Sequence, residues 1–181
     1  MNQNHIIETE LDKLVSKTQQ LVESGQLPKN TKVTSPEFEI NIRGALGGQC
    51  CLQRDGRVFL RFNSVLMRDN FKDYVSDTIP HEYAHYVIMS NRHRSYYKGE
   101  RGHGKKWRRV MRLLGVEPKT CHKMDTSNAV KPYTYNCECK VWELTKIRHN
   151  KILRGSVAYS CPTCHAPIVE RLPKLTKVEL S

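Results

Sequence analysis

The sequence has no long apolar run and no recognisable export signal. Its hydrophobic stretches all fall short of the roughly 20 residues that a membrane-spanning helix needs. The first residues, 1–13, are polar and acidic and lack the apolar segment of a signal peptide. Internal repeats and low-complexity tracts are missing too, which excludes repeat architectures. We therefore expect a folded, soluble, cytoplasmic protein that makes no use of a membrane.

Acidic residues are few relative to basic ones. Thirty Lys and Arg stand against 18 Asp and Glu, which gives a formal charge of +12. Residues 92–112 hold nine of the basic residues and one acid, Glu100, so two-thirds of the excess charge lies in one stretch. Charge of this size predicts a partner rather than a fold, and nucleic acid is the leading candidate. An acidic protein partner, or a surface that is merely soluble, are the alternatives.

The seven cysteines have no spacing typical of a secreted disulfide framework. In a chain that stays inside the cell, metal binding is favoured over disulfides. Four cysteines form two close pairs near the C-terminus, whereas Cys50, Cys51 and Cys121 lie apart from them. Cys50 and Cys51 fall in a predicted strand, and we expect both to be buried there as free thiols.

Hydrophobic periodicity predicts helices and strands in separate parts of the chain. Apolar residues recur at helical spacing over 7–24, and an amphipathic basic helix is predicted over 104–114. Residues 37–64 alternate as strands, with a hairpin turn at Asp55-Gly56. Residues 65–90 are helical, and Pro80 inside this run either starts a new helix or kinks a continuous one.

After about residue 133 the pattern changes to short strands. We expect strands over 133–139, 140–148 and 152–160, with a turn at 149–151. The predicted fold class is therefore α+β, with one domain over 1–132 and a small β-rich module over 133–181. A helix-rich core over a small antiparallel sheet is expected in the first of these.

The segment His81-Glu82-Tyr83-Ala84-His85 carries the chemistry. Two histidines four residues apart lie on one face of a helix, where their imidazoles can converge on one tetrahedral zinc. Glu82 follows the first of them and can reach a water at the metal without binding the metal itself. This spacing predicts a zinc site held by His81 and His85, with Glu82 as the catalytic base.

The third ligand is open on spacing alone. Asn91 stands where a metzincin would have histidine, which excludes that class. Glu100 could supply a carboxylate, and His93 and His103 could supply an imidazole. His103 precedes the helix at 104–114, whose N-terminus favours the neutral imidazole that binds metal.

The two cysteine pairs predict a second, structural zinc. Cys137 and Cys139 are separated by one residue, Cys161 and Cys164 by two, and 21 residues lie between the pairs. A β-hairpin could bring the four thiolates together in a closed site. The alternatives are four metal-free cysteines, or His165 as a ligand in place of one sulfur of the first pair.

Two parts of the sequence resemble the SprT-like (Spartan) family of zinc metallopeptidases, in its bacterial SprT form. One is Ile79 to His85 followed by Gly102-His103-Gly104-Lys105-Lys106-Trp107; the other is the cysteine pairs together with Arg148-His149-Asn150. The resemblance implies a zincin-like (minigluzincin-like) core and a C-terminal zinc ribbon. It also implies catalytic zinc on His81, His85 and His103, with Glu82 as base, and leaves Glu100 as runner-up.

We therefore expect a zinc metalloendopeptidase that cleaves proteins, with DNA-bound proteins as the substrates that the Spartan branch implies. Nucleic-acid contacts are expected from Arg108, Arg109, Arg148 and Lys151. The alternatives are a non-enzymatic, transcription-associated zinc-ribbon factor with a vestigial site, and a zinc hydrolase acting on a small substrate. Tyr96, Tyr97 and Arg101 lie in the right stretch to stabilise an oxyanion, and the sequence does not select among them.

Overall fold

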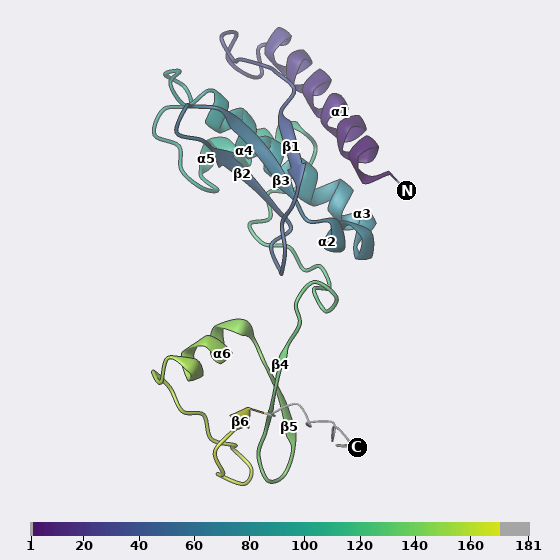
Figure 1. Cartoon of the computed structure of the whole chain (residues 1–181). Coiled ribbons are helices and arrows are strands. Elements are labelled where there is room, and N and C mark those ends of the chain that lie inside the picture. Colours follow the sequence, from purple (N-terminus) through teal and green to yellow (C-terminus); the bar gives the residue numbers. More distant parts are fainter. Residues whose placement is uncertain (1, 171–181) are drawn as a thin grey trace. The chain divides into compact units, whose positions relative to one another are not determined.

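The chain folds into two compact units, residues 1–130 and 131–181, in a computed structural model that describes residues 2–170 (Figure 1). The boundary lies two residues before the one predicted between residues 132 and 133. Within the described part, no helix has both the length and the apolar character needed to cross a membrane. The expected α+β class is confirmed, because helices and two small sheets occur together.

The core of the first unit is built around helix α4, Ile79–Ser90. This helix packs against the sheet and against two other helices, α1 (Gln3–Glu23) and α5 (Lys105–Leu113). The apolar stripe predicted on α1 is buried, with Ile7 and Leu11 among its members. The helix that carries His81-Glu82-Tyr83-Ala84-His85, the HExxH segment, is therefore held on several sides by hydrophobic packing.

The sheet of the first unit has the order β1-β3-β2, with β1 over Glu37–Ile40, β2 over Gly48–Leu52 and β3 over Val58–Phe62 (Figure 1). β2 and β3 form the predicted antiparallel hairpin, but β1 pairs with β3 in parallel. The expectation of a wholly antiparallel sheet is therefore wrong. β3 is the central strand, and its residues Leu60 and Phe62 are both 0% exposed.

A loop at residues 44–47 leads into β2 and is fixed by side chains. The Asn63 amide donates to the carbonyls of Gly44 and Leu46 at 2.8 and 2.9 Å, and the Tyr74 hydroxyl donates to that of Gly47. The side-chain oxygen Oδ1 of Asn63 accepts from the backbone N–H groups of Val65 and Leu66 at the start of helix α2, Ser64–Asp69. One buried asparagine thus joins the loop to a helix cap.

Pro80 lies in the first turn of α4, inside a helical run that continues without a break from Phe71 to Ser90. Of the two alternatives for this proline, a separate helix starting here is therefore not the one observed. The short helix α3, Phe71–Asp73, leads into a π-helical turn over Tyr74–Thr78, and Ile79 N–H donates to the Tyr74 carbonyl five residues earlier. This wider turn brings Asp77 and Thr78 next to the HExxH segment.

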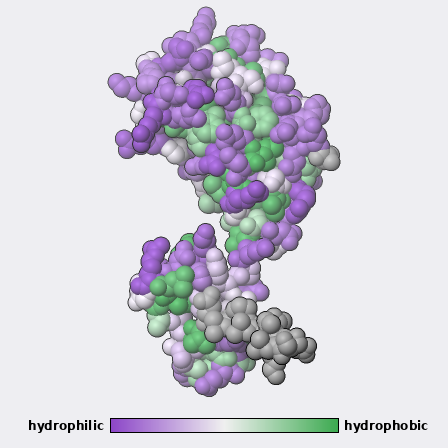
Figure 2. Space-filling view, viewed as in Figure 1, coloured by the Kyte–Doolittle hydropathy of each residue, from purple (hydrophilic) through white to green (hydrophobic). Residues whose placement is uncertain are grey.

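The second unit contains the sheet β5-β4-β6, formed by β4 (Tyr133–Asn136), β5 (Val141–Leu144) and β6 (Val169–Glu170). Its small core consists of Tyr135, Leu144, Cys161 and Ile168. Figure 2 shows that apolar residues also reach the surface of this unit. Ile147 and Leu153 are among its exposed apolar side chains.

The strand pattern predicted for residues 145–160 is wrong. Residues Lys146–Leu153 form helix α6, and the predicted turn at 149–151 lies inside it. His149 is 8% exposed, stacks on the Tyr133 ring and hydrogen-bonds to the Tyr135 hydroxyl at 2.9 Å. Thr145 before the helix and Gly155 after it, with φ of 64°, are the start and stop signals in the sequence.

Replacing Asn63 by Ala should destabilise the first unit by about 2–4 kcal/mol. The substitution leaves two carbonyls and two helix N–H groups without their partner, and each buried group left unsatisfied is costly. Asn41→Ala, at an exposed position, should cost less than about 0.5 kcal/mol. Urea unfolding of both variants measures the difference, and equal effects would contradict the role given to Asn63.

Candidate metal centres

Three histidines converge in the first unit. His81 and His85 project from the same face of α4, and His103 comes from the loop before α5. Their ligand nitrogens all lie within 4.8 Å of one another, and the Nε2 atoms of His81 and His103 are 2.9 Å apart. Zinc–nitrogen bonds of 2.0–2.1 Å place tetrahedral ligand atoms about 3.4 Å apart, so this cluster fits a zinc ion.

Burial keeps these imidazoles neutral. It lowers the pKa of His81 to about 4, with the neighbouring His103 adding to the effect, and lowers the pKa of His85 to about 3. It also lowers the pKa of His103, to which Arg108 contributes. A neutral imidazole is the form that binds a metal, so the cluster needs to lose no proton at neutral pH.

Trp107 forms the wall behind the histidines. Its ring lies 4.5–5.2 Å from all three imidazoles, measured between centroids, and its indole N–H donates to the His81 carbonyl at 3.4 Å. Trp107 is fully buried. Trp107 thus belongs to the core and also contacts the candidate ligands directly.

The two other candidates for the third ligand lie elsewhere. The Glu100 carboxylate accepts from the N–H groups of Lys106 and Trp107 at 2.8 and 3.3 Å, so it caps α5. His93 is exposed in the loop after α4 and is not part of the cluster. Among the described residues the geometry therefore brings His103, and neither of these, to His81 and His85.

Glu82 lines the same pocket, which has a volume of about 410 Å³. It is 7% exposed, and burial raises the pKa of its carboxyl to about 7 although the backbone N–H of Cys50 donates to it. A general base works best when its pKa is close to the working pH. The pKa of Glu82 therefore suits it to accept and return a proton.

Gly48 makes room for Glu82. A Cβ at this position would lie 2.5 Å from Glu82 Cγ, a contact that real side chains do not make. Gly48 opens the edge strand β2, so this strand runs close to Glu82 because its first residue has no side chain.

The opposite wall of the pocket was not foreseen. It is formed by residues of the irregular segment that follows α5, including Lys119 and His122. The Lys119 carbonyl accepts a hydrogen bond from the His81 ring. Of the residues considered for oxyanion stabilisation, Tyr97 is buried against Thr31, and neither it nor Tyr96 nor Arg101 lines the pocket.

The second unit brings four cysteines together. The sulfurs of Cys137, Cys139, Cys161 and Cys164 lie within 4.8 Å of one another. Cys139 Sγ is 3.5 Å from Cys137 Sγ and 3.6 Å from Cys161 Sγ. Zinc–sulfur bonds of about 2.3 Å place tetrahedral sulfurs about 3.8 Å apart, so the C-x-C pair fits with both sulfurs. His165 is outside the group.

The thiols share a site that favours a cation. Backbone N–H groups of Cys164 and Thr163 donate to Cys161 and lower the pKa of its thiol to about 6. Hydrogen bonds with the neighbouring sulfurs, Cys137 first, raise the pKa of Cys139 to about 12. Negative charge on one sulfur thus opposes ionisation of the next, and a bound metal cation would remove that conflict.

The residues predicted to contact nucleic acid are exposed in both units. Arg108 and Arg109 lie on α5, where each donates to a backbone carbonyl, that of His103 and that of Gln26 respectively. Arg148 and Lys151 lie on α6. Figure 2 shows hydrophilic residues over much of the visible face of the first unit.

Comparison with known proteins gives one consistent result. The model of the SprT-like family matches residues 11–126. The chain is 36% identical over 148 residues to Protein SprT of Vibrio parahaemolyticus, covering 81% of this chain and 82% of that protein. It is 33% identical to Protein SprT of Shewanella oneidensis, with 72% and 80% covered, and 34% identical to that of Proteus mirabilis, with 76% and 79% covered. No solved structure matches.

The buried carboxyl of Glu82 should make the metal-free protein less stable as the pH rises. Its pKa is about 7 when folded and 4.5 when exposed, so its contribution is fully present below pH 4.5 and lost as the pH passes 7. In metal-free protein, Glu82→Gln should therefore be stabilising by about 2–3 kcal/mol at pH 8 and by much less at pH 5.

Urea unfolding followed by Trp107 fluorescence measures this, in a Trp142→Phe background that leaves Trp107 as the sole tryptophan. Glu117→Gln, at an exposed position on the same pocket, is the control and should change stability little at either pH. A Glu82→Gln effect that does not grow with pH would contradict the raised pKa.

Proposed function

We propose that this chain, which belongs to the SprT-like family, is a zinc-dependent metallopeptidase with a zincin-like core. The observation that carries the proposal is the convergence of His81, His85 and His103 beside Glu82 in one pocket. Three neutral imidazoles are the donor set of a catalytic zinc site with an open fourth position, and the nearby carboxylate is free to act on a water there.

Zinc held by the three imidazoles would supply Lewis acidity, lowering the pKa of a water molecule and polarising the scissile carbonyl. Glu82 takes a proton from the attacking water and delivers it to the nitrogen of the leaving amine. Water addition and C–N cleavage thus balance, with Glu82 unchanged after each turnover. Trp107 and the Lys119 carbonyl keep the imidazoles in place throughout.

The edge position of β2 suits a protein substrate. β2 is one of the two outer strands of the sheet, and its residues Gly48, Gln49 and Cys50 line the pocket. An extended peptide could pair with such an edge and pass beside Glu82. Leu46, which is 50% exposed at the same pocket, offers an apolar contact for a substrate side chain.

Glu82→Gln should abolish proteolysis while leaving the metal in place. Glutamine keeps the size of the side chain but cannot accept the proton, so we expect activity to fall by about two to four orders of magnitude. Cleavage of a casein-type substrate, with and without DNA, measures this. His81→Ala should lose the metal as well, whereas Glu117→Gln should keep both metal and activity.

Full proteolysis by Glu82→Gln would refute the assignment of the base. A wild-type protein with zinc bound at the histidines and no proteolysis under any condition would instead favour a non-enzymatic binding factor.

The protein should carry two zinc ions per chain, one on the histidines and one on the four cysteines. Replacing Cys161 and Cys164 by Ser should remove one ion and unfold the second unit, because structural zinc contributes directly to folding. Cys121→Ser, at an exposed cysteine outside the group, should keep both. Elemental analysis of the purified proteins measures the number of zinc ions per chain. A single zinc in the wild type that is lost in His81→Ala would contradict the four-cysteine site.

We also propose that DNA-associated proteins are the substrates. The support is the net charge of +12 and the exposed basic residues of α5 and α6. In the second unit, Lys140 lies over the Trp142 ring at 4.0 Å, a pairing of cation and aromatic group that also suits stacked bases. The cytoplasmic location stays a prediction.

Charge reversal at Arg148 and Lys151 should weaken DNA binding about equally for all sequences and lower the slope of affinity against salt by about 2, one per phosphate contact. Fluorescence anisotropy of labelled single-stranded DNA, over a series of salt concentrations, measures this. Lys13→Glu with Lys29→Glu makes the same change of charge at exposed sites of the first unit and should leave the slope unchanged. Affinity that does not depend on salt would contradict the proposal.

A further inference from the structure

One wall of the pocket is an irregular segment with few hydrogen bonds of its own. Residues 117–125, the clamp segment, contain no helix or strand. One backbone hydrogen bond closes within the segment, from Lys119 N–H to the Glu117 carbonyl. Its position therefore depends on contacts that side chains make between it and the rest of the first unit.

Lys119 is attached to the start of α4 at two points. Its carbonyl accepts a hydrogen bond from the His81 ring, and its ammonium group lies 2.8 Å from Asp77 Oδ2. Asp77 and His81 are four residues apart, so they lie one helical turn from each other on one face. Two neighbouring side chains of α4 and its leading turn thus hold the same residue.

The hydrogen bond to Lys119 determines which His81 nitrogen faces the other histidines. Nε2 of His81 lies 2.9 Å from Nε2 of His103, so the nitrogen that donates to Lys119 is Nδ1. A ring with its proton on Nδ1 presents the lone pair of Nε2 to the cluster. Backbone carbonyls that hold a ligating histidine in this way raise metal affinity, typically by 10- to 100-fold.

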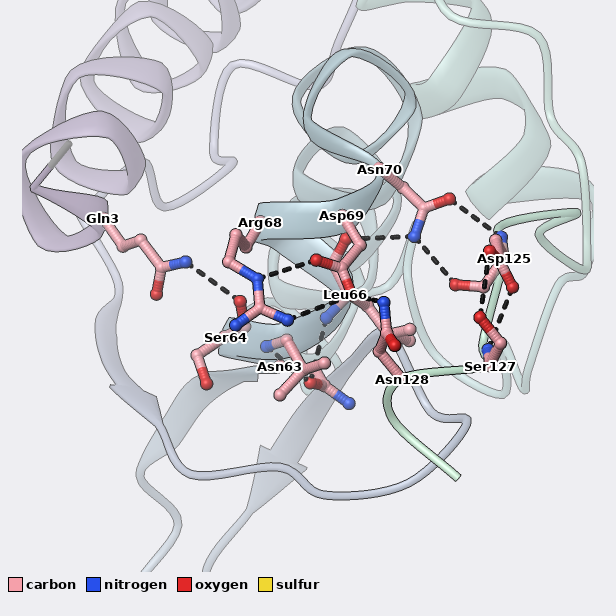
Figure 3. A network of polar contacts seen from close by, with 11 residues as sticks. Gln3, Asn63, Ser64, Leu66, Arg68, Asp69, Asn70, Asp125, Ser127 and Asn128 are labelled. Carbon is pink, nitrogen blue, oxygen red and sulfur yellow. Dashed lines mark hydrogen bonds and ion pairs between the residues drawn. The ribbon is translucent and has the colours of Figure 1, made fainter. Parts of the chain in front are cut away.

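The other end of the clamp segment is fixed by Asn70. Its side chain accepts from Asp125 N–H at 2.8 Å and donates to the Asp125 carbonyl at 2.9 Å, as Figure 3 shows. Between the two ends, His122 Nε2 lies 3.0 Å from the Ala45 carbonyl, and Met124 is buried next to Thr78. The clamp segment is therefore held along the wall of the pocket between two anchors, Lys119 and the contact of Asp125 with Asn70.

We propose that Lys119 and Asn70 are positioning residues for the metal site, which hold the clamp segment against His81 and so fix the tautomer of its ring. This inference rests on the proposed function, because it concerns the metal that the histidines hold. Neither side chain is a ligand in the cluster. Their effect passes through the Lys119 carbonyl.

The test is the double variant Lys119→Met with Asn70→Ala, which releases both anchors. Removing a positive charge beside a cation site would by itself slow metal loss, so electrostatics and positioning predict opposite changes. We expect the cobalt-substituted variant to lose the histidine-bound ion to a chelator about 10-fold faster. Thiolate-to-cobalt absorption identifies the cysteine site, so the two ions are followed separately.

Matched variants separate positioning from general destabilisation. Arg57→Met with Asn128→Ala removes an exposed ion pair to Asp55 and a hydrogen bond to Asp69 in the network of Figure 3, and should leave the loss of cobalt unchanged. Lys119→Arg keeps the pair with Asp77 and should behave as the wild type. Unchanged or slower loss of cobalt in the Lys119→Met, Asn70→Ala variant would overturn the proposal.

A second measurement needs no metal. In metal-free protein, the His81 Nδ1–H resonance should be protected from exchange in the wild type and in Lys119→Arg, and broadened by exchange in the double variant. Equal protection in all three would overturn the positioning role. If the wild type takes up no cobalt at the histidines, the proposed function fails, and this resonance still decides whether Lys119 and Asn70 fix the ring.

Discussion

The structure depends on the partial burial of two imidazoles and the burial of one carboxyl on a core helix. His81, Glu82 and His85 lie on α4, whose other residues pack against the sheet and two helices. Such burial disfavours every charged form, so it keeps the histidines neutral and raises the pKa of Glu82. The same packing that stabilises the unit thus prepares ligands for a cation and a base for a water molecule.

The other features of the first unit serve that helix. Trp107 closes one side of the cluster, Gly48 lets the edge strand approach Glu82, and Glu100 caps α5 so that His103 is presented at its N-terminus. The four-cysteine group belongs to a unit with its own small core, where sulfur spacing rather than hydrophobic area would stabilise the fold once metal is bound.

Local spacing was enough to predict His81 and His85 on one helical face and the hairpin of β2 and β3. Spacing alone did not identify the third ligand, because Glu100, His93 and His103 lie in one loop. Only the fold shows which of them reaches His81 and His85. Helix α6 was missed because its aliphatic residues, Ile147, Ile152 and Leu153, do not recur at helical spacing, although Thr145 and Gly155 mark its ends. The clamp segment has no periodicity, so nothing in its sequence indicated that Lys119 reaches His81.

The central claim is that the three histidines hold a catalytic zinc. Anomalous diffraction above and below the zinc absorption edge, on crystals of the protein as purified, tests it directly. The account predicts a zinc peak bonded to His81, His85 and His103 Nε2 with one position left for water, beside Glu82. A zinc coordinated by Glu100, or no zinc at these histidines while the four cysteines hold one, would contradict it.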